Sequence, residues 1–208
     1  MLALWLIRPK KNPTEISRDD VYSCPDQTRG SHYSGPTRVS LVDSQTMRII
    51  NTVKIAVESD LGKDTFDIPY AIRPGNYYRV EAHVAATVES KPTIIWLKDY
   101  NGDGRVLEFA LFEAEACMGL QTTLIGYSEQ KDRVIQFPIK LDVIEGRKHS
   151  SRISLWADYL FNEKPQRPGY WKYEIDYRGR AGTLDKYEVR YNAALERFEG
   201  TLTSIEGN

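Results

Sequence analysis

Hydrophobic and polar residues alternate along much of this chain with the period of two that is typical of β-strands. The alternation is clearest in the last third, where apolar side chains in residues 171–177 and 187–191 are separated by charged ones. A third run follows at Phe198–Leu202, and the connections between the three runs are short. This pattern predicts an antiparallel meander with one buried face and one face in water.

Further segments are rich in β-branched and aromatic residues and are bounded by turn formers, which is typical of strands. We therefore predict an all-β fold of about eleven strands, arranged as an antiparallel β-sandwich or a barrel-like meander. Leu107–Met118 also contains good helix formers, but we favour a strand at its start. The remaining predicted strands are Arg38–Asp43, Met47–Glu58, Thr65–Ile72, Tyr77–Glu89, Thr93–Leu97, Glu108–Phe112, Thr122–Tyr127, Arg133–Ile144 and Arg152–Phe161.

The N-terminal residues 1–20 differ from the rest of the chain. The apolar run MLALWLI is followed by basic residues, which fits either the remnant of a hydrophobic leader or an edge strand. Turn formers and polar residues then dominate up to Thr37, which predicts an irregular N-terminal arm. Residues 21–208 are expected to form a single β-rich domain.

Composition narrows the range of partners. The formal net charge of −1 gives no electrostatic reason for binding nucleic acid. An apolar run as short as MLALWLI cannot span a bilayer, so we expect no stable membrane insertion. Cys24 and Cys117 could form one disulfide or remain two separate thiols, and their spacing fits no metal motif.

One stretch suggests a specific chemistry. Asp99, Asn101 and Asp103 place oxygen-bearing side chains at every second residue, and Gly104 follows where a loop around an ion needs a sharp turn. Arg105, the next residue, would offer its backbone carbonyl. Calcium prefers several such oxygen ligands, so this spacing suggests a calcium site.

The stretch DYNGDG resembles the DxNGDG calcium loops of FG-GAP and VCBS-type extracellular repeats, and the opening of dockerin loops. Those loops close with an acidic residue at the ninth or twelfth position, where this chain has Leu107 and Ala110. Glu108 could take that closing role. The resemblance implies a calcium ion bound by Asp99, Asn101, Asp103, the Arg105 carbonyl and Glu108, with the weak affinity of extracellular modules, ~10⁻⁴ to 10⁻³ M.

The alternative for the same stretch is a tight hairpin turn that binds no ion. Asn-Gly and Asp-Gly pairs are the strongest sequence signals for such a turn. Both interpretations remain open from the sequence.

Catalytic signatures are absent from the sequence. His32, His83 and His149 lie in no nucleophile or metalloprotease motif. Glu113 and Glu115 would share one face of a strand as a carboxylate pair, but such pairs also arise by chance.

The aromatic residues of the meander, led by Trp171 and Tyr187, could form a sugar-stacking platform. Because the opposite face is charged, we interpret them instead as the core face. We predict a secreted or periplasmic, bacterial-type module that is non-enzymatic, has a binding or structural role, and serves a carbohydrate or protein ligand. The alternatives are a polysaccharide-acting hydrolase using acidic residues near 99–115 and a metal-free cytosolic β domain.

Overall fold

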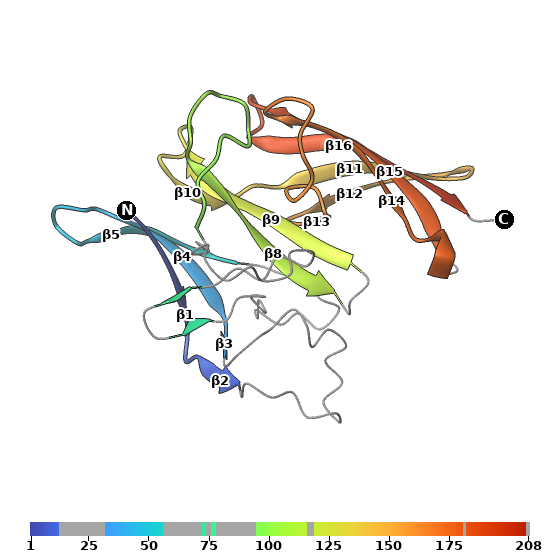
Figure 1. Ribbon diagram of the computed structural model, residues 1–208. Coiled ribbons are helices and arrows are strands. Elements are labelled where there is room, and N and C mark those ends of the chain that lie inside the picture. Colours follow the sequence, from blue (N-terminus) through green and yellow to red (C-terminus); the bar gives the residue numbers. More distant parts are fainter. Residues whose placement is uncertain are drawn as a thin grey trace.

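The computed structural model describes residues 1–12, 32–55, 72–73, 76–77, 95–115, 119–180 and 182–206. This part of the chain forms sixteen β-strands and a short 3-10 turn at Arg178–Arg180, and contains no α-helix. The sheets pack together as a β-sandwich around a shared core, which confirms the predicted all-β class (Figure 1). The strands outnumber the predicted eleven because two predicted runs, Arg133–Ile144 and Arg152–Phe161, are each split and because further short strands form near the N-terminus. The predicted irregular arm was wrong at His32–Ser34, which form a strand.

The largest sheet has five strands and contains the predicted meander. Its β14, β15 and β16 pair antiparallel in chain order, as the alternating pattern indicates. The pairing of β11 with β16 is parallel, so the expectation of a purely antiparallel fold was wrong at this point. In spatial order the strands are β12 (Lys148–Ser154), β11 (Ile139–Glu145), β16 (Arg197–Glu206), β15 (Thr183–Asn192) and β14 (Tyr170–Asp176).

The second sheet is built on the long strand β9 (Gly119–Ser128). Strand β8 (Glu108–Glu115) pairs with β9 along the whole length of β8. Strand β8 confirms the strand prediction over the helical alternative. On its other edge β9 pairs with the short strands β10 (Arg133–Gln136) and β13 (Ala157–Asp158). Six consecutive residues of β9, 121–126, are buried, so both faces of this strand are covered.

Proline divides the predicted Arg133–Ile144 strand into β10 and β11. Pro138 has no N–H to donate to a sheet, so the pairing of β10 with β9 ends at Phe137. The chain then joins the five-stranded sheet, where the Phe198 N–H donates to the Pro138 carbonyl at 2.9 Å. This crossing connects the two sheets of the sandwich.

A third sheet is formed near the N-terminus by β1 (Leu2–Leu6), β4 (Thr37–Val42) and β5 (Ile49–Lys54). The apolar run at the N-terminus thus forms an edge strand. Two small pairs complete the described strands: β2 (Lys10–Asn12) with β3 (His32–Ser34), and β6 (Ile72–Arg73) with β7 (Asn76–Tyr77). Most of the predicted arm, and of the predicted strands 65–72 and 77–89, lies outside the described residues.

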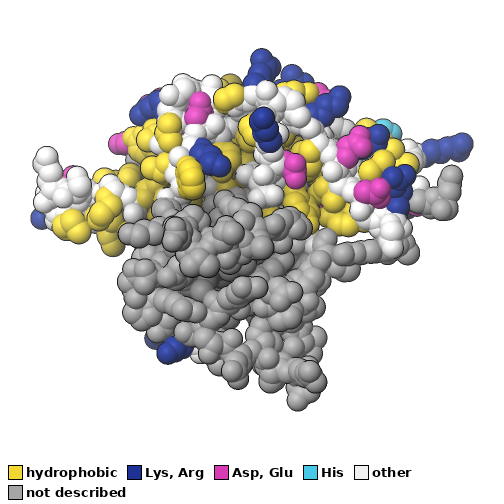
Figure 2. All heavy atoms as spheres, viewed as in Figure 1, with side chains coloured by type: hydrophobic (Ala, Val, Ile, Leu, Met, Phe, Trp, Pro, Cys, Tyr) yellow, Lys and Arg dark blue, Asp and Glu magenta, His cyan; other side chains and the backbone are white. Residues whose placement is uncertain are grey.

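The β4–β5 hairpin extends from the body of the molecule, and one of its side chains hydrogen-bonds to the backbone of the second sheet. The amide of Asn51 donates to the Val134 carbonyl at 2.9 Å and accepts from the Val134 N–H at 3.1 Å. Asn51 therefore hydrogen-bonds to both the carbonyl and the N–H of Val134 in β10. Hydrophobic side chains gather over the hairpin tip, where Met47, Ile49 and Ile50 are exposed (Figure 2).

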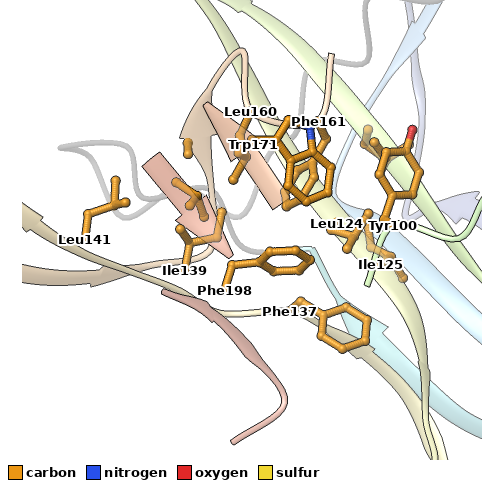
Figure 3. Close-up of a cluster of buried hydrophobic side chains, with 14 of the residues drawn as sticks. Tyr100, Leu124, Ile125, Phe137, Ile139, Leu141, Leu160, Phe161, Trp171 and Phe198 are labelled. Atoms are coloured by element: carbon orange, nitrogen blue, oxygen red, sulfur yellow. The ribbon is translucent and has the colours of Figure 1, made fainter. Parts of the chain in front are cut away.

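The core is dominated by aromatic rings that meet edge to face. Phe161, Trp171 and Phe198 pack with ring centroids 5.1–5.7 Å apart, and Tyr100 stacks on Trp171 (Figure 3). Such ring contacts stabilise the fold beyond what burial of the rings alone provides. Trp171 and Tyr187 are fully or almost fully buried, which confirms that the aromatic row of the meander belongs to the core face.

Candidate functional site

The acidic stretch forms a loop that is closed by a bridge between Lys98 and Glu108. The Lys98 N–H donates to the Glu108 carbonyl at 2.8 Å, and the Glu108 N–H donates to the Lys98 carbonyl at 3.3 Å. The bridge therefore encloses a loop of residues 99–107, which is longer than the tight turn that Asn-Gly and Asp-Gly pairs favour. The predicted strand Thr93–Leu97 is wrong over residues 95–97, because pairing on this side is limited to the Lys98 bridge.

Asp99 shapes the first half of the loop. Its carboxylate accepts the Gly102 N–H at 2.7 Å and the Gly104 N–H at 3.0 Å. Both glycines have positive φ, at 79° and 85°, a backbone region that other residues rarely adopt. The chain can therefore curl around the Asp99 carboxylate, as the spacing of the sequence predicts.

Asn101 brings two of the other predicted ligands together. Its amide nitrogen donates to Asp103 Oδ2 at 3.1 Å and to Glu108 Oε1 at 3.2 Å. Its amide oxygen accepts the Asp103 N–H at 2.9 Å. The Asn101 amide nitrogen thus hydrogen-bonds to the carboxylates of both Asp103, inside the loop, and Glu108, at the bridge that closes it.

Glu108 is the buried member of this group, with none of its surface exposed. Its second oxygen accepts the Tyr100 N–H at 3.0 Å. Burial raises the pKa of the Glu108 carboxyl from its ordinary 4.5 to about 7, and the negative charges of Asp103 and Asp99 add to the rise. The hydrogen bonds from Tyr100 and Asn101 oppose this rise.

Space for the Glu108 side chain comes from a glycine on the neighbouring strand. Gly126 of β9 lies directly opposite Glu108, and a Cβ atom at this position would meet Glu108 Cγ at 2.6 Å. It would also come within 3.0 Å of the Leu107 carbonyl and the Phe137 ring. Only a glycine at position 126 lets the glutamate fold inward between these groups.

The loop is fixed to the body of the sandwich by a second turn. A Cβ atom on Gly102 would lie 2.7 Å from the Pro168 carbonyl, and one on Gly169 would lie 2.6 Å from the Asn101 carbonyl. The Gly169 N–H also donates to the Tyr100 carbonyl at 3.1 Å. With the Tyr100 ring stacked on Trp171, the loop is anchored in the aromatic core.

Arg105 turns away from the acidic group and pairs with Glu129 at the β9–β10 turn. None of the ion pairs found among the described residues involves Glu108. The Arg105 carbonyl was the group predicted to serve as a ligand, and the outward direction of its side chain is compatible with that role.

Other predicted candidates do not form a site in the described part of the chain. His149 lies exposed on β12. Cys24, Cys117 and His83 lie outside the described residues, as do the side chains of His32, Glu113 and Glu115. The disulfide and the carboxylate pair therefore stay predictions.

Sequence reasoning missed a second buried carboxylate. Glu196, in the turn between β15 and β16, is 5% exposed and accepts a hydrogen bond from Ser128 Oγ, which lies 2.6 Å and 2.7 Å from its two oxygens. Lys131 Nζ lies 3.8 Å from the same carboxylate. An acidic residue in a hairpin turn is normally exposed, so no local pattern could have identified it.

Comparison with known proteins places this chain in no group: no family model, curated protein or solved structure matches it. Within the described residues, no group of three or more His, Cys, Asp or Glu side chains is arranged to hold a metal ion. The same residues include no helix of the length and hydrophobicity needed to cross a membrane.

Proposed function

We propose that this protein is a non-enzymatic β-sandwich module of the secreted or periplasmic type, in which a calcium ion stabilises the 99–108 loop. The observation that carries this proposal is the position of the Asn101 amide. It lies between the Asp103 and Glu108 carboxylates, and the ion pairs of the described residues supply no cationic side chain to Glu108. A cation at this place would neutralise both carboxylates.

The oxygen-bearing groups of the loop suit calcium better than a transition metal. Calcium accepts six to eight oxygen ligands from carboxylates, amides, carbonyls and water. Asp99, Asn101, Asp103, Glu108 and the Arg105 carbonyl supply such groups. Carboxylate oxygens have two lone pairs each, so those of Asp99 and Asp103 that accept backbone N–H groups can still bind an ion. A half-turn of the Asn101 amide would direct its oxygen toward the carboxylates, at the cost of the hydrogen bond that this oxygen accepts from the Asp103 N–H.

The ion would have a structural role with a small energetic effect. Because the Asp99 carboxylate also caps the loop backbone, the free loop is already largely formed. With a dissociation constant of ~10⁻⁴ to 10⁻³ M, millimolar calcium adds about 1 kcal/mol or less to the free energy of unfolding. A site of this affinity would fill at extracellular calcium concentrations, so the calcium proposal goes together with the secreted or periplasmic setting.

The hydrolase alternative would use Glu108 as a general acid, since its pKa of about 7 suits that task. A general acid must reach the glycosidic oxygen of its substrate. Glu108 has no exposed surface, and its carboxylate is bonded to Tyr100 and Asn101. Its position is better suited to a buried metal ligand.

The test is thermal unfolding of chelator-stripped protein at pH 8, titrated with calcium and separately with magnesium. At this pH Glu108 is ionised, and metal binding requires deprotonated ligands. We expect a calcium-selective rise in melting temperature of about 2–4 °C at most, which corresponds to about 1 kcal/mol for a chain of this size. The rise should be absent in Asp103→Ala.

Asp43→Ala is the matched control for this experiment. Asp43 also caps a turn, accepting the Gln45 and Thr46 N–H groups at 2.9 and 2.7 Å, but it lies in the β4–β5 hairpin. This variant should lose some stability and keep the calcium response. No shift up to ~10 mM calcium, an equal shift with magnesium, or a shift that survives in Asp103→Ala would refute the calcium site.

A further inference from the structure

The outer face of the five-stranded sheet contains an open depression of about 550 Å³. It lies over β11, β16 and β15 and continues to the β15–β16 turn. This volume falls within the range of about 300–1,000 Å³ found for small-molecule sites. In Figure 2, charged side chains of both signs gather over the upper part of the molecule, where Figure 1 places this sheet.

Strand register arranges the polar side chains of the depression in two rows. Lys140, Glu199 and Arg190 are directly opposite one another across the three strands. Asp142 and Thr201 form the next row. Because neighbouring strands lie about 4.8 Å apart, donors and acceptors alternate across the sheet at about this spacing, so a ligand that spans the row must offer several hydrogen-bonding groups.

One acceptor of the depression is held firmly in place. The Glu199 carboxylate accepts Arg197 Nε at 2.7 Å and Asn192 Nδ2 at 2.8 Å, so each of its oxygens has a fixed donor. These hydrogen bonds also keep the pKa of Glu199 below its ordinary value. A side chain that is already ordered loses little entropy when a ligand binds.

The charged residues that line the depression carry two charges of each sign, and Glu199 is also paired with Arg197. Lys140 and Arg190 are positive, and Asp142 and Glu199 are negative. Lys140 lies 3.7 Å from Asp142, whereas Arg190 takes part in none of the ion pairs found among the described residues. A strongly charged ligand gains little from such a surface. A ligand with many hydroxyl groups fits it well, because each hydroxyl both donates and accepts.

An aromatic ring borders the same row. Tyr170 of β14 is directly opposite Arg190, and its hydroxyl donates to Glu188 at 3.2 Å. The ring is half-buried, and the Arg167 guanidinium carbon lies over it, 5.7 Å from the ring centroid. Tyr170 therefore marks the edge of the polar row on the β14 side and does not offer an uncovered stacking face.

We propose that this depression binds a neutral oligosaccharide, with Lys140, Asp142, Arg190 and Glu199 as its hydrogen-bonding groups. The site is separate from the 99–108 loop, and the proposal goes beyond a calcium-stabilised module. The module would then attach to glycan, and the calcium loop would serve only the stability of the fold.

The test is isothermal calorimetry of the full chain with short cello-, xylo-, manno-, malto- and chito-oligosaccharides, at low and high salt. We expect at least one neutral glycan to bind with an affinity that changes little with salt, because no net charge is neutralised. Asp142→Ala and Arg190→Ala should each weaken binding about tenfold or more, as expected when a hydrogen bond to a charged group is lost.

Glu174→Ala is the matched control, since Glu174 is an exposed acid of the same sheet, on β14 and outside the depression. It should leave the affinity unchanged, and all three variants should unfold near the wild-type temperature. Three results would each overturn the proposal: no neutral glycan binds, the affinity is the same in all variants, or binding is restricted to acidic polysaccharides and disappears at high salt.

Discussion

Glu108 and Glu196 are both glutamates whose side chains are buried in the described part of the chain, but their surroundings differ. Glu196 is bonded to the Ser128 hydroxyl and lies near the Lys131 ammonium. A buried carboxylate is tolerated when hydrogen bonds and a positive charge compensate for the loss of water. The Glu196 site therefore contains its own counter-charge.

Glu108 has hydrogen-bond donors, but its charged neighbours are Asp99 and Asp103. Burial and these like charges favour the protonated form, which is why the pKa of Glu108 rises to about 7. A proton or a metal ion can relieve this repulsion, and both depend on the solution. Glu196 is thus stabilised by its own neighbours, whereas the charge state of Glu108 depends on the pH and the cations of the solution.

The largest expected effect that tests this difference is the pH dependence of stability without calcium. Between pH 4.5 and 7 the folded protein retains a proton on Glu108 that the unfolded chain has released. The free energy of unfolding should therefore fall as the pH rises through this interval, by up to about 3 kcal/mol from this group, and level off above pH 7.

Chemical denaturation of wild type and Glu108→Gln across pH 5–8 measures this contribution. The difference between the two proteins removes the effect of other carboxyls, including Asp43 and Asp176, whose pKa values are lowered. A slope that persists unchanged in Glu108→Gln would show that another group is responsible.

The second prediction concerns the space that Gly126 provides for Glu108. Gly126→Ala should lower the free energy of unfolding by about 1–3 kcal/mol, because its Cβ would overlap Glu108 Cγ and press on Leu107 and Phe137. The control is Gly179→Ala, since a Cβ there meets no other atom within 4 Å. Urea denaturation of both variants checks this, and equal effects would show that the contact with Glu108 is relaxed.

The smallest expected effect is the one that separates Glu108 from Glu196 most directly. At pH 8 without calcium, Glu108→Gln should raise the free energy of unfolding by about 1 kcal/mol, because loss of a desolvated charge outweighs weaker hydrogen bonds. Glu196→Gln should lower it by about 1 kcal/mol, because the Ser128 hydrogen bond weakens and Lys131 loses its partner. Denaturant titration at pH 8 measures both, and effects of the same sign would remove the distinction.

Local pattern was sufficient for much of the fold. The alternation in β14, β15 and β16 identified the strands, their buried faces and their antiparallel order. The parallel pairing of β11 with β16 was not predictable, because it joins distant segments and depends on the crossing at Pro138. A period of two identifies a strand and its faces but contains no information about a distant partner.

The candidate site, like the fold, could be predicted from the sequence only in part. The spacing of Asp99, Asn101 and Asp103 indicated a loop closed by side-chain oxygens, and the structure brings Glu108 to Asn101, whose amide also reaches Asp103. The burial of Glu108 depends on Gly126, which belongs to another strand. No local motif could reveal this dependence.

Asn51 has a consequence for the solubility of the protein. An open strand edge exposes N–H and C=O groups that can recruit a strand from another molecule and begin aggregation. On β10 the Asn51 amide occupies both groups of Val134, as an added strand would, but a side chain offers no further edge to continue the sheet. At Val134 a single asparagine thus occupies the position that a recruited strand would need.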